Sequence, residues 1–230
     1  TEVSSVNVEL HVNRTPVVTM QSTTPQNICE LTSFSLSVGA VGGDPVYPFS
    51  GNLPFSYAWS FNGTPLSNGG VVSGATSSVL TISSMSSSYA GSYACTVTNT
   101  CGSTTSSAAV INLYTRPVVT QQPNNQTVCP IYAGAVTSNL GNGQAVFAVA
   151  VSGTPSPAIQ WQFDGGAGFN DIQDGAMYSG TTTNTLTVPN LAYLDGRVGT
   201  YRVKVTNTCF TVYSNAGGAL NVNRQVSITS

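Results

Sequence analysis

The sequence predicts an all-β protein made of two similar β-sandwiches in tandem, end to end, with an extra strand before the first. Three observations support this prediction. The 230-residue chain repeats itself once, with a period of just over 100 residues. Short segments alternate between apolar and other side chains with period 2, as half-buried antiparallel strands do. Gly, Pro and Asn turns separate these segments, and no stretch has a sustained helical period.

The two copies carry the same motifs in the same order. The motifs are Pro16, Cys29, Trp59, Tyr93 and Cys101 in the first copy, and Pro117, Cys129, Trp161, Tyr201 and Cys209 in the second. The Cys-to-Trp spacing is 30 residues in one copy and 32 in the other, and the Tyr-to-Cys spacing is 8 in both. The repeat predicts domains at 16–115 and 116–224, a separate strand at 1–15, and the start of a following segment at 225–230.

Each copy contains several segments with the alternation of a strand. They are 33–38, 57–61, 79–85 and 93–98 in the first copy, and 145–151, 159–163, 185–188 and 200–206 in the second. About seven short strands per 100 residues are typical of a sandwich.

The aromatic residues locate the core. A tryptophan followed by the tyrosine of a Gly-x-Tyr motif, here 34 residues later in the first copy and 40 in the second, is the core pattern of immunoglobulin domains. The expected strand C tryptophans are Trp59 and Trp161, the tyrosine corners Tyr93 and Tyr201, the strand F core residues Cys95 and Val203, and the facing strand B residues Val38 and Val151. The usual disulfide between strands B and F is therefore replaced by aliphatic packing, with the Cys95 thiol as a small hydrophobe.

The full pattern, Gln-x-x-Cys, Tyr-x-Trp, Gly-x-Tyr and Thr-Asn-x-Cys-Gly, resembles the immunoglobulin-like repeats of large secreted surface proteins of Bacteroidota-type bacteria, including adhesin-like ones. The stretch 161–172 is similar to their C–C′ hairpin. The resemblance covers nearly the whole chain and implies an extracellular or cell-surface location. It implies no particular ligand, because such repeats often serve as spacers.

Composition excludes several functions. Charged residues are 6% of the chain, the net charge is −2, and the six cations are scattered. A nucleic-acid partner needs a concentrated basic patch, and a membrane-spanning helix needs roughly 18 consecutive apolar residues. We therefore expect no nucleic-acid partner and no membrane span.

The cysteines outside the core predict a junction between domains. Cys29 and Cys129 fall at the A–B corner, whereas Cys101 and Cys209 follow strand F at the F–G turn. These corners lie at opposite poles of a sandwich, and nine extended residues span about 30 Å, far more than the roughly 7 Å that a disulfide allows between Cα atoms. In a head-to-tail tandem the prediction is an inter-domain bridge from Cys29 to Cys209, with Cys101 and Cys129 bonded to neighbouring units.

Two alternatives to this bridge stay open: two intradomain bridges, Cys29–Cys101 and Cys129–Cys209, or reduced thiols. Either set of disulfides would indicate an oxidising compartment.

The first residues resemble a last strand without its own domain. Val6, Val8, Leu10 and Val12 alternate in the same way as the segment before Pro117. They are interpreted as the tail of a preceding repeat, as an extra strand of the first domain, or as a donor strand that completes the sheet of a neighbour.

The groups needed for catalysis are sparse. The only histidine is His11, so a Ser-His-Asp or Cys-His site is not expected, and no cofactor is predicted. Asp164, Asp171 and Asp174 form an acidic cluster that a hairpin turn explains more simply than a bound cation.

An insertion at 42–55 lengthens the B–C loop of the first domain and carries three aromatic residues, Tyr47, Phe49 and Phe55. Binding loops cluster at such a sandwich end, so this is a candidate contact loop; otherwise it covers the end of the domain.

Together these features predict a structural or adhesive extracellular protein that is not an enzyme. It would be a stiff repeat array or a surface filament subunit, joined pole to pole to neighbouring repeats or identical subunits. The alternatives are a module that binds a surface glycan or protein, and an accessory segment of a secreted hydrolase.

Overall fold

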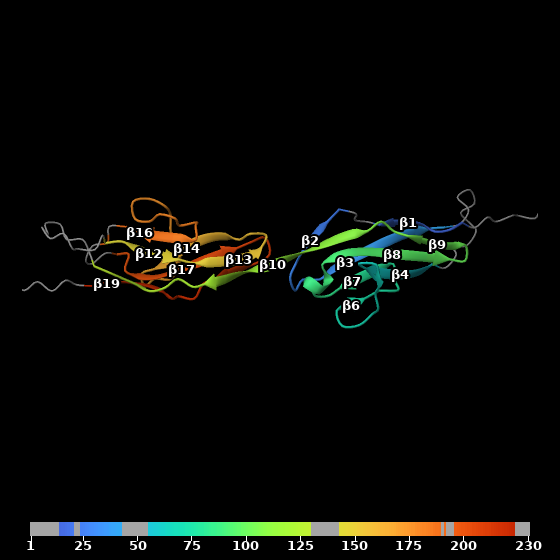
Figure 1. The fold of residues 1–230 in the computed structure, drawn as a ribbon, viewed down its shortest axis with the longest axis horizontal. Coiled ribbons are helices and arrows are strands. Elements are labelled where there is room, and N and C mark those ends of the chain that lie inside the picture. Colours follow the sequence, from blue (N-terminus) through green and yellow to red (C-terminus); the bar gives the residue numbers. More distant parts are fainter. Residues whose placement is uncertain are drawn as a thin grey trace, which may run out of the picture. The chain divides into compact units, whose positions relative to one another are not determined.

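The computed structural model describes residues 14–20, 24–42, 55–129, 143–189, 191 and 196–223 (Figure 1). The chain divides into two compact units, here called unit 1 (Thr1–Leu113) and unit 2 (Tyr114–Ser230). Both are built from strands, and the one helical element among the described residues is a short 3-10 turn, η1 (Ser87–Tyr89). The prediction of an all-β protein with two immunoglobulin-like sandwiches is confirmed.

Unit 1 has two facing sheets. The first has the order β1-β3-β7-β6, with β1 (Val17–Met20), β3 (Phe34–Val41), β7 (Val79–Ile82) and β6 (Val72–Ser73). The second contains β10 (Ala109–Gln121), β8 (Gly91–Asn99), β4 (Ser56–Phe61) and β5 (Thr64–Pro65), with β2 (Gln26–Cys29) on β10 and β9 (Gly102–Thr105) on β8. Strand β10 starts in unit 1, where residues 109–111 pair with β8, and continues into unit 2.

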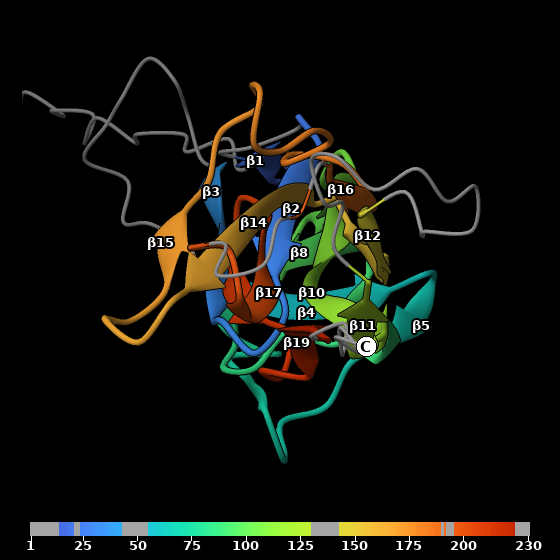
Figure 2. The same cartoon turned by 90° about the vertical axis from the view of Figure 1, so that its left-hand side faces the viewer.

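Unit 2 repeats this arrangement. Its larger sheet has the order β11-β19-β17-β14-β15, with β11 (Gln126–Val128), β19 (Gly218–Val222), β17 (Gly199–Thr206), β14 (Ala158–Asp164), β15 (Asn170–Asp171), and β18 (Thr211–Tyr213) on β17. The facing pair is β12 (Ala145–Ala148) and β16 (Thr185–Val188), while β13 (Ala150–Thr154) pairs with the second part of β10. Figure 2 shows β12 and β16 across from β14 and β17.

The alternating sequence decides which side chains enter the core. In β8 and β17 every second residue is buried, because successive side chains of a strand point to opposite faces. All six predicted core residues are buried, each with at most 1% of its surface exposed: Trp59, Trp161, Tyr93, Tyr201, Cys95 and Val203.

Hydrogen bonds hold the two tryptophans in the same way. The indole Nε1 of Trp59 donates to the carbonyl of Ser77 at 2.8 Å, and that of Trp161 donates to the carbonyl of Thr183 at 2.9 Å. A buried indole N–H needs such a partner, because leaving it unpaired costs free energy.

The tyrosine corners are also formed in both units. The Tyr93 hydroxyl donates to the carbonyl of Tyr89 at 2.7 Å, and the Tyr201 hydroxyl donates to the carbonyl of Arg197 at 2.8 Å. Both bonds reach back four residues, as the tyrosine corner requires.

One predicted core position in unit 2 is wrong. Val151 lies in β13, opposite Val119 of β10, and is only partly buried. The strand B core residues are Ala145, Phe147 and Val149. The register explains the difference: Phe147 faces Leu186 as Leu36 faces Leu80 in unit 1, which makes Val149 the counterpart of Val38.

Among the described residues, the structure has no helix of the length and apolar character needed to cross a membrane.

Candidate functional site

The cysteines are in two different states. Cys29 and Cys209 are disulfide-bonded, whereas Cys95, Cys101 and Cys129 are free thiols. The alternative with bridges Cys29–Cys101 and Cys129–Cys209 is therefore wrong, and so is the alternative in which all thiols are reduced. The bond between Cys29 and Cys209 and the bonds of Cys101 and Cys129 to neighbouring units stay predictions.

Strand lengths explain why the intradomain bridges do not form. In unit 2, Cys209 follows the end of β17, while Cys129 follows β11, which pairs with β19 beside the start of β17. Strand β17 has 8 residues and therefore separates the two thiols by about 25 Å. Unit 1 has the same topology: Cys29 ends β2, and Cys101 follows β8. Strands β2 and β9 lie at opposite ends of the unit (Figure 1).

The free cysteines differ in their surroundings. Cys101 and Cys129 are exposed, whereas Cys95 is fully buried between the sheets. Burial raises the pKa of the Cys95 thiol, which keeps it neutral and unreactive. The structure thus places Cys95 in the core and the other two thiols at the surface, as the sequence predicts.

Each F–G turn holds the chain that enters its sandwich. In unit 2 the Asn207 side chain donates from Nδ2 to the carbonyl of Thr115 at 2.8 Å, and its Oδ1 accepts the Cys209 N–H at 3.0 Å. In unit 1 the Asn99 side chain donates to the carbonyl of Arg14 at 2.8 Å, and its Oδ1 accepts the Cys101 N–H at 2.8 Å.

These two asparagines occupy the same place in the repeated Thr-Asn-Thr-Cys motif. Each donates a hydrogen bond to the carbonyl of the residue two positions before the first proline of its sandwich. Sequence reasoning missed this contact, although the repeated asparagine was the signal. The contact therefore fixes Cys101 and Cys209 beside the segment of the chain that enters each sandwich.

The three aspartates of the acidic cluster are not brought together. Asp164 accepts the N–H groups of Gly166 and Gly168, and Asp174 accepts the N–H of Thr181. Asp171 binds Gln162 and Lys204 instead. The structure forms the predicted hairpin, β14 with β15, and in the described part of the chain no three His, Cys, Asp or Glu side chains are grouped to hold a metal ion.

Most of the predicted contact loop and the possible donor strand fall outside the described residues. This applies to Tyr47 and Phe49, and to Val6, Val8, Leu10 and Val12 with His11. Phe55 is described: it is partly buried and packs against the core of unit 1. Its ring therefore supports the end of the sandwich.

A charged cluster that sequence reasoning missed lies on the outer face of unit 2. The guanidinium of Arg202 lies over the Phe169 ring at 3.9 Å and over the Tyr213 ring at 4.3 Å. Its Nε donates to Oε1 of Gln162 at 2.8 Å. Gln162 is only 7% exposed and donates from Nε2 to Asp171 at 2.7 Å.

An ion pair continues this cluster. Lys204 Nζ lies 3.0 Å from Oδ2 of Asp171. The hydrogen bonds from Gln162 and Lys204 lower the pKa of Asp171, so that this carboxylate stays ionised to a lower pH than an unpaired aspartate. The available signal was the alternation in 200–206, which places Arg202 and Lys204 on one face of the strand.

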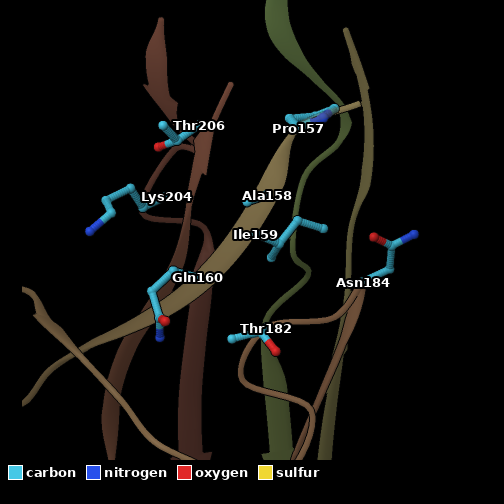
Figure 3. Close-up of a pocket in the computed structure, with 8 residues that line it drawn as sticks. All are labelled: Pro157, Ala158, Ile159, Gln160, Thr182, Asn184, Lys204 and Thr206. Carbon is cyan, nitrogen blue, oxygen red and sulfur yellow. The ribbon is translucent and has the colours of Figure 1, made fainter. Parts of the chain in front are cut away.

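A pocket of about 640 Å³ adjoins this face. It is lined by Pro157 and by residues of β14, β17 and the segment before β16: Ala158, Ile159, Gln160, Thr182, Asn184, Lys204 and Thr206 (Figure 3). Its walls combine short aliphatic groups with side chains that both donate and accept hydrogen bonds.

The fold and core define the class of protein to which the chain belongs. Two sandwiches, each with a central tryptophan and a tyrosine corner, are those of immunoglobulin-like domains. The immunoglobulin I-set domain model matches residues 48–111 and 135–217. The chain belongs to the immunoglobulin I-set family.

Solved structures and one curated protein show similarity. The structure resembles Sidekick-1 immunoglobulin domains 1-4, with a TM-score of 0.60 and 18% identity, over 95% of this chain and 51% of that one. It resembles the N-terminal eight Ig domains of Down Syndrome Cell Adhesion Molecule isoform 1.30.30, with a TM-score of 0.59 and 20% identity, over 91% of this chain and 25% of that one.

The curated relative is Endoglucanase C of Cellulomonas fimi, 37% identical over 100 residues, which are 44% of this chain and 7% of that enzyme. The chain therefore spans a small part of this relative and about half or less of the two solved structures. At these identities the solved structures show the fold alone. The family model that matches the chain is that of an immunoglobulin domain and not of a catalytic family. A kinship with Bacteroidota-type surface proteins stays a prediction.

Proposed function

We propose that this chain is a structural or adhesive section of an extracellular immunoglobulin-like array whose domains are joined pole to pole by disulfides. The observation that carries the proposal is the repeated F–G turn. In unit 2 the Asn207 side chain of this turn donates to the carbonyl of Thr115, where the chain enters the sandwich, and it accepts the N–H of the disulfide-bonded Cys209. In unit 1 the Asn99 side chain of the same turn donates to the carbonyl of Arg14 and accepts the N–H of the free Cys101.

The first step of the proposal is the bond inside the chain. Cys29 and Cys209 are the cysteines in the disulfide-bonded state, and the other three are free thiols. We therefore assign the bond to Cys29 with Cys209, from the A–B corner of unit 1 to the F–G turn of unit 2.

The second step follows from the internal repeat. Cys101 occupies in unit 1 the place that Cys209 has in unit 2, and Cys129 occupies the place of Cys29. The same bond between Cys129 of one unit and Cys101 of the next would continue the array. Both thiols are exposed, as such a bond requires. The neighbour is a further repeat or an identical subunit, and the undescribed residues 1–13 are a candidate donor strand for it.

The comparisons are consistent with this role. Down Syndrome Cell Adhesion Molecule is named for adhesion, and the solved structure comprises consecutive Ig domains. Disulfides form in oxidising compartments, which agrees with an extracellular location. The low content of charged residues and the high content of Ser and Thr also favour an exported surface protein. The resemblance to Bacteroidota-type repeats favours a bacterial protein.

Counting thiols tests the proposed states directly. Under non-reducing conditions a thiol reagent should react with two cysteines of the native monomer and with three after denaturation, because Cys95 is buried. After reduction it should react with all five cysteines. Non-reducing peptide mapping should then yield one cross-linked peptide that joins Cys29 and Cys209. A peptide joining Cys29 to Cys101 would rule out the array.

Assembly is tested on material under oxidising conditions. Ladders of higher mass on non-reducing gels should disappear in the double variant Cys101→Ser, Cys129→Ser, while Cys95→Ser should leave them unchanged. Electron microscopy should show polymers for the wild type. Monomers alone, with no ladder at any protein concentration, would contradict assembly through these thiols.

A second candidate rests on the match to Endoglucanase C: the chain would be an accessory segment of a secreted hydrolase. Mass spectrometry of the intact native polypeptide distinguishes the two. Peptides of a catalytic domain on the same polypeptide would favour the accessory role, and immunoglobulin-like repeats alone would exclude it.

A further inference from the structure

Arg202 is a preorganised cation on the described surface of unit 2. Its guanidinium is stacked between the rings of Phe169 and Tyr213, and its Nε is bonded to Gln162. Gln162 is itself 7% exposed and bonded to Asp171, so it cannot turn away without leaving a buried amide unpaired. The plane and the direction of the guanidinium are therefore set before any ligand arrives.

The two terminal nitrogens of Arg202 remain available. Within the described residues, neither Nη1 nor Nη2 makes a hydrogen bond or an ion pair. The nearby carboxylate of Asp171 is already bound to Gln162 and Lys204. Besides the cations of Arg202 and Lys204, this face carries the carboxylates of Asp171 and Asp164, and Asp164 is bound to the N–H groups of Gly166 and Gly168.

The pocket begins at the next outward-facing position. Lys204 follows Arg202 by two residues on β17, so the two side chains stand on one face about 7 Å apart. Lys204 lines the pocket together with Gln160, Thr206, Thr182 and Asn184, as Figure 3 shows. Its volume of about 640 Å³ lies within the range of about 300–1,000 Å³ found for small-ligand pockets.

We propose that this surface binds a carboxylate-bearing polysaccharide, with Arg202 holding a uronate carboxylate and the pocket holding an adjoining sugar. The terminal nitrogens of a guanidinium form a fork that matches a carboxylate. Amide and hydroxyl side chains that donate and accept suit sugar hydroxyls, and Pro157 and Ala158 add apolar groups to the lining.

A saccharide fits this surface better than an extended acidic peptide. A peptide would gain affinity by adding a strand to a free sheet edge. Strand β14 offers little free edge, because it lies between β17 and β15, and the Trp161 N–H already donates to the Thr181 carbonyl at 2.8 Å. Pro157, just before β14, has no N–H to donate to such a ladder. Sugar hydroxyls use the side chains and need no ladder.

The test measures binding of the whole chain to polygalacturonate by affinity electrophoresis and calorimetry at physiological ionic strength. Arg202→Ala and Arg202→Lys should each weaken binding roughly tenfold to a hundredfold, because both remove the fork and only the first removes the charge. Arg116→Ala is the matched control in the same unit: its guanidinium lies over the Phe210 ring at 4.8 Å and is outside the pocket.

Other arms separate the possible outcomes. Methyl-esterified polygalacturonate should bind much more weakly, and Asn184→Ala should reduce affinity through the pocket without touching Arg202. Equal losses in Arg202→Ala and Arg116→Ala would overturn the proposal in favour of general charge attraction. Tighter binding of poly-glutamate than of polygalacturonate would overturn it in favour of a peptide. Failure of the folded wild type to bind any of these polymers would also overturn it. None of these outcomes depends on whether the chain assembles.

Discussion

Ser214 tests whether one buried hydrogen bond contributes to the stability of unit 2. Its hydroxyl accepts the Val203 N–H at 3.0 Å, and the side chain is 4% exposed. In Ser214→Ala the Val203 N–H, in the centre of β17, loses its partner where water cannot replace it. An unpaired buried donor costs about 1–3 kcal/mol. At about 4 °C for each kcal/mol in a domain of this size, the melting temperature of unit 2 should fall by about 4–12 °C.

Tryptophan fluorescence provides an assay for each unit separately, because each core contains one tryptophan. In a Trp59→Phe background, guanidinium unfolding followed at Trp161 reports on unit 2. The matched control is Thr211→Val, which removes an exposed hydroxyl pair with Thr206 and should change the free energy of unfolding by less than about 0.5 kcal/mol. If Ser214→Ala were no more destabilising than this control, the buried bond would contribute nothing and the reasoning would be refuted.

The remaining predictions concern charge and backbone. Because the folded-state pKa of Asp171 is lowered, its ionised form stabilises unit 2 above the usual aspartate range, and this contribution is lost as the pH falls through the lowered pKa. Lys204→Ala should move the Asp171 titration upward in NMR spectra; an unchanged midpoint would contradict the ion pair. Gly180→Ala should destabilise unit 2 by more than about 1 kcal/mol, because Gly180 has a φ of +80° and an added Cβ would collide with the Thr185 carbonyl. Gly166→Ala is the control, since its φ is also positive, at +110°, but nothing lies within 4 Å of its Cβ. Equal changes in melting temperature for Gly180→Ala and Gly166→Ala would show that the structure relieves the collision with the Thr185 carbonyl, and would contradict this prediction.

The asparagine contact of the F–G turn is found in both units, whereas the charged cluster around Arg202 is found in unit 2. The asparagine contact recurs in both units, so it is a property of the repeat. The Arg202 cluster has no counterpart on the matching described strands of unit 1, where Ala94 lies opposite Ser60 and unit 2 has Arg202 opposite Gln162. The proposed role in assembly can therefore be shared by both units, whereas the proposed ligand site belongs to unit 2.

The sequence alone determined the sandwich and its core. Alternation with period 2 assigns a face to every second residue, so the burial of Trp59, Trp161, Cys95 and Val203 follows from local pattern and repeat. The same alternation could not locate Val149, because the chain between Cys129 and β12 differs in length from its counterpart, and cross-strand pairing decides the register there.

Only the tertiary structure decided which polar groups meet. Arg202 and Phe169 are far apart in sequence, and so are Asn207 and Thr115. Such contacts depend on strand order, on register and on the direction of each side chain, none of which is encoded within a few neighbouring residues. Apolar periodicity is a local property of the chain, whereas a hydrogen bond between distant strands exists only once the sheet has formed.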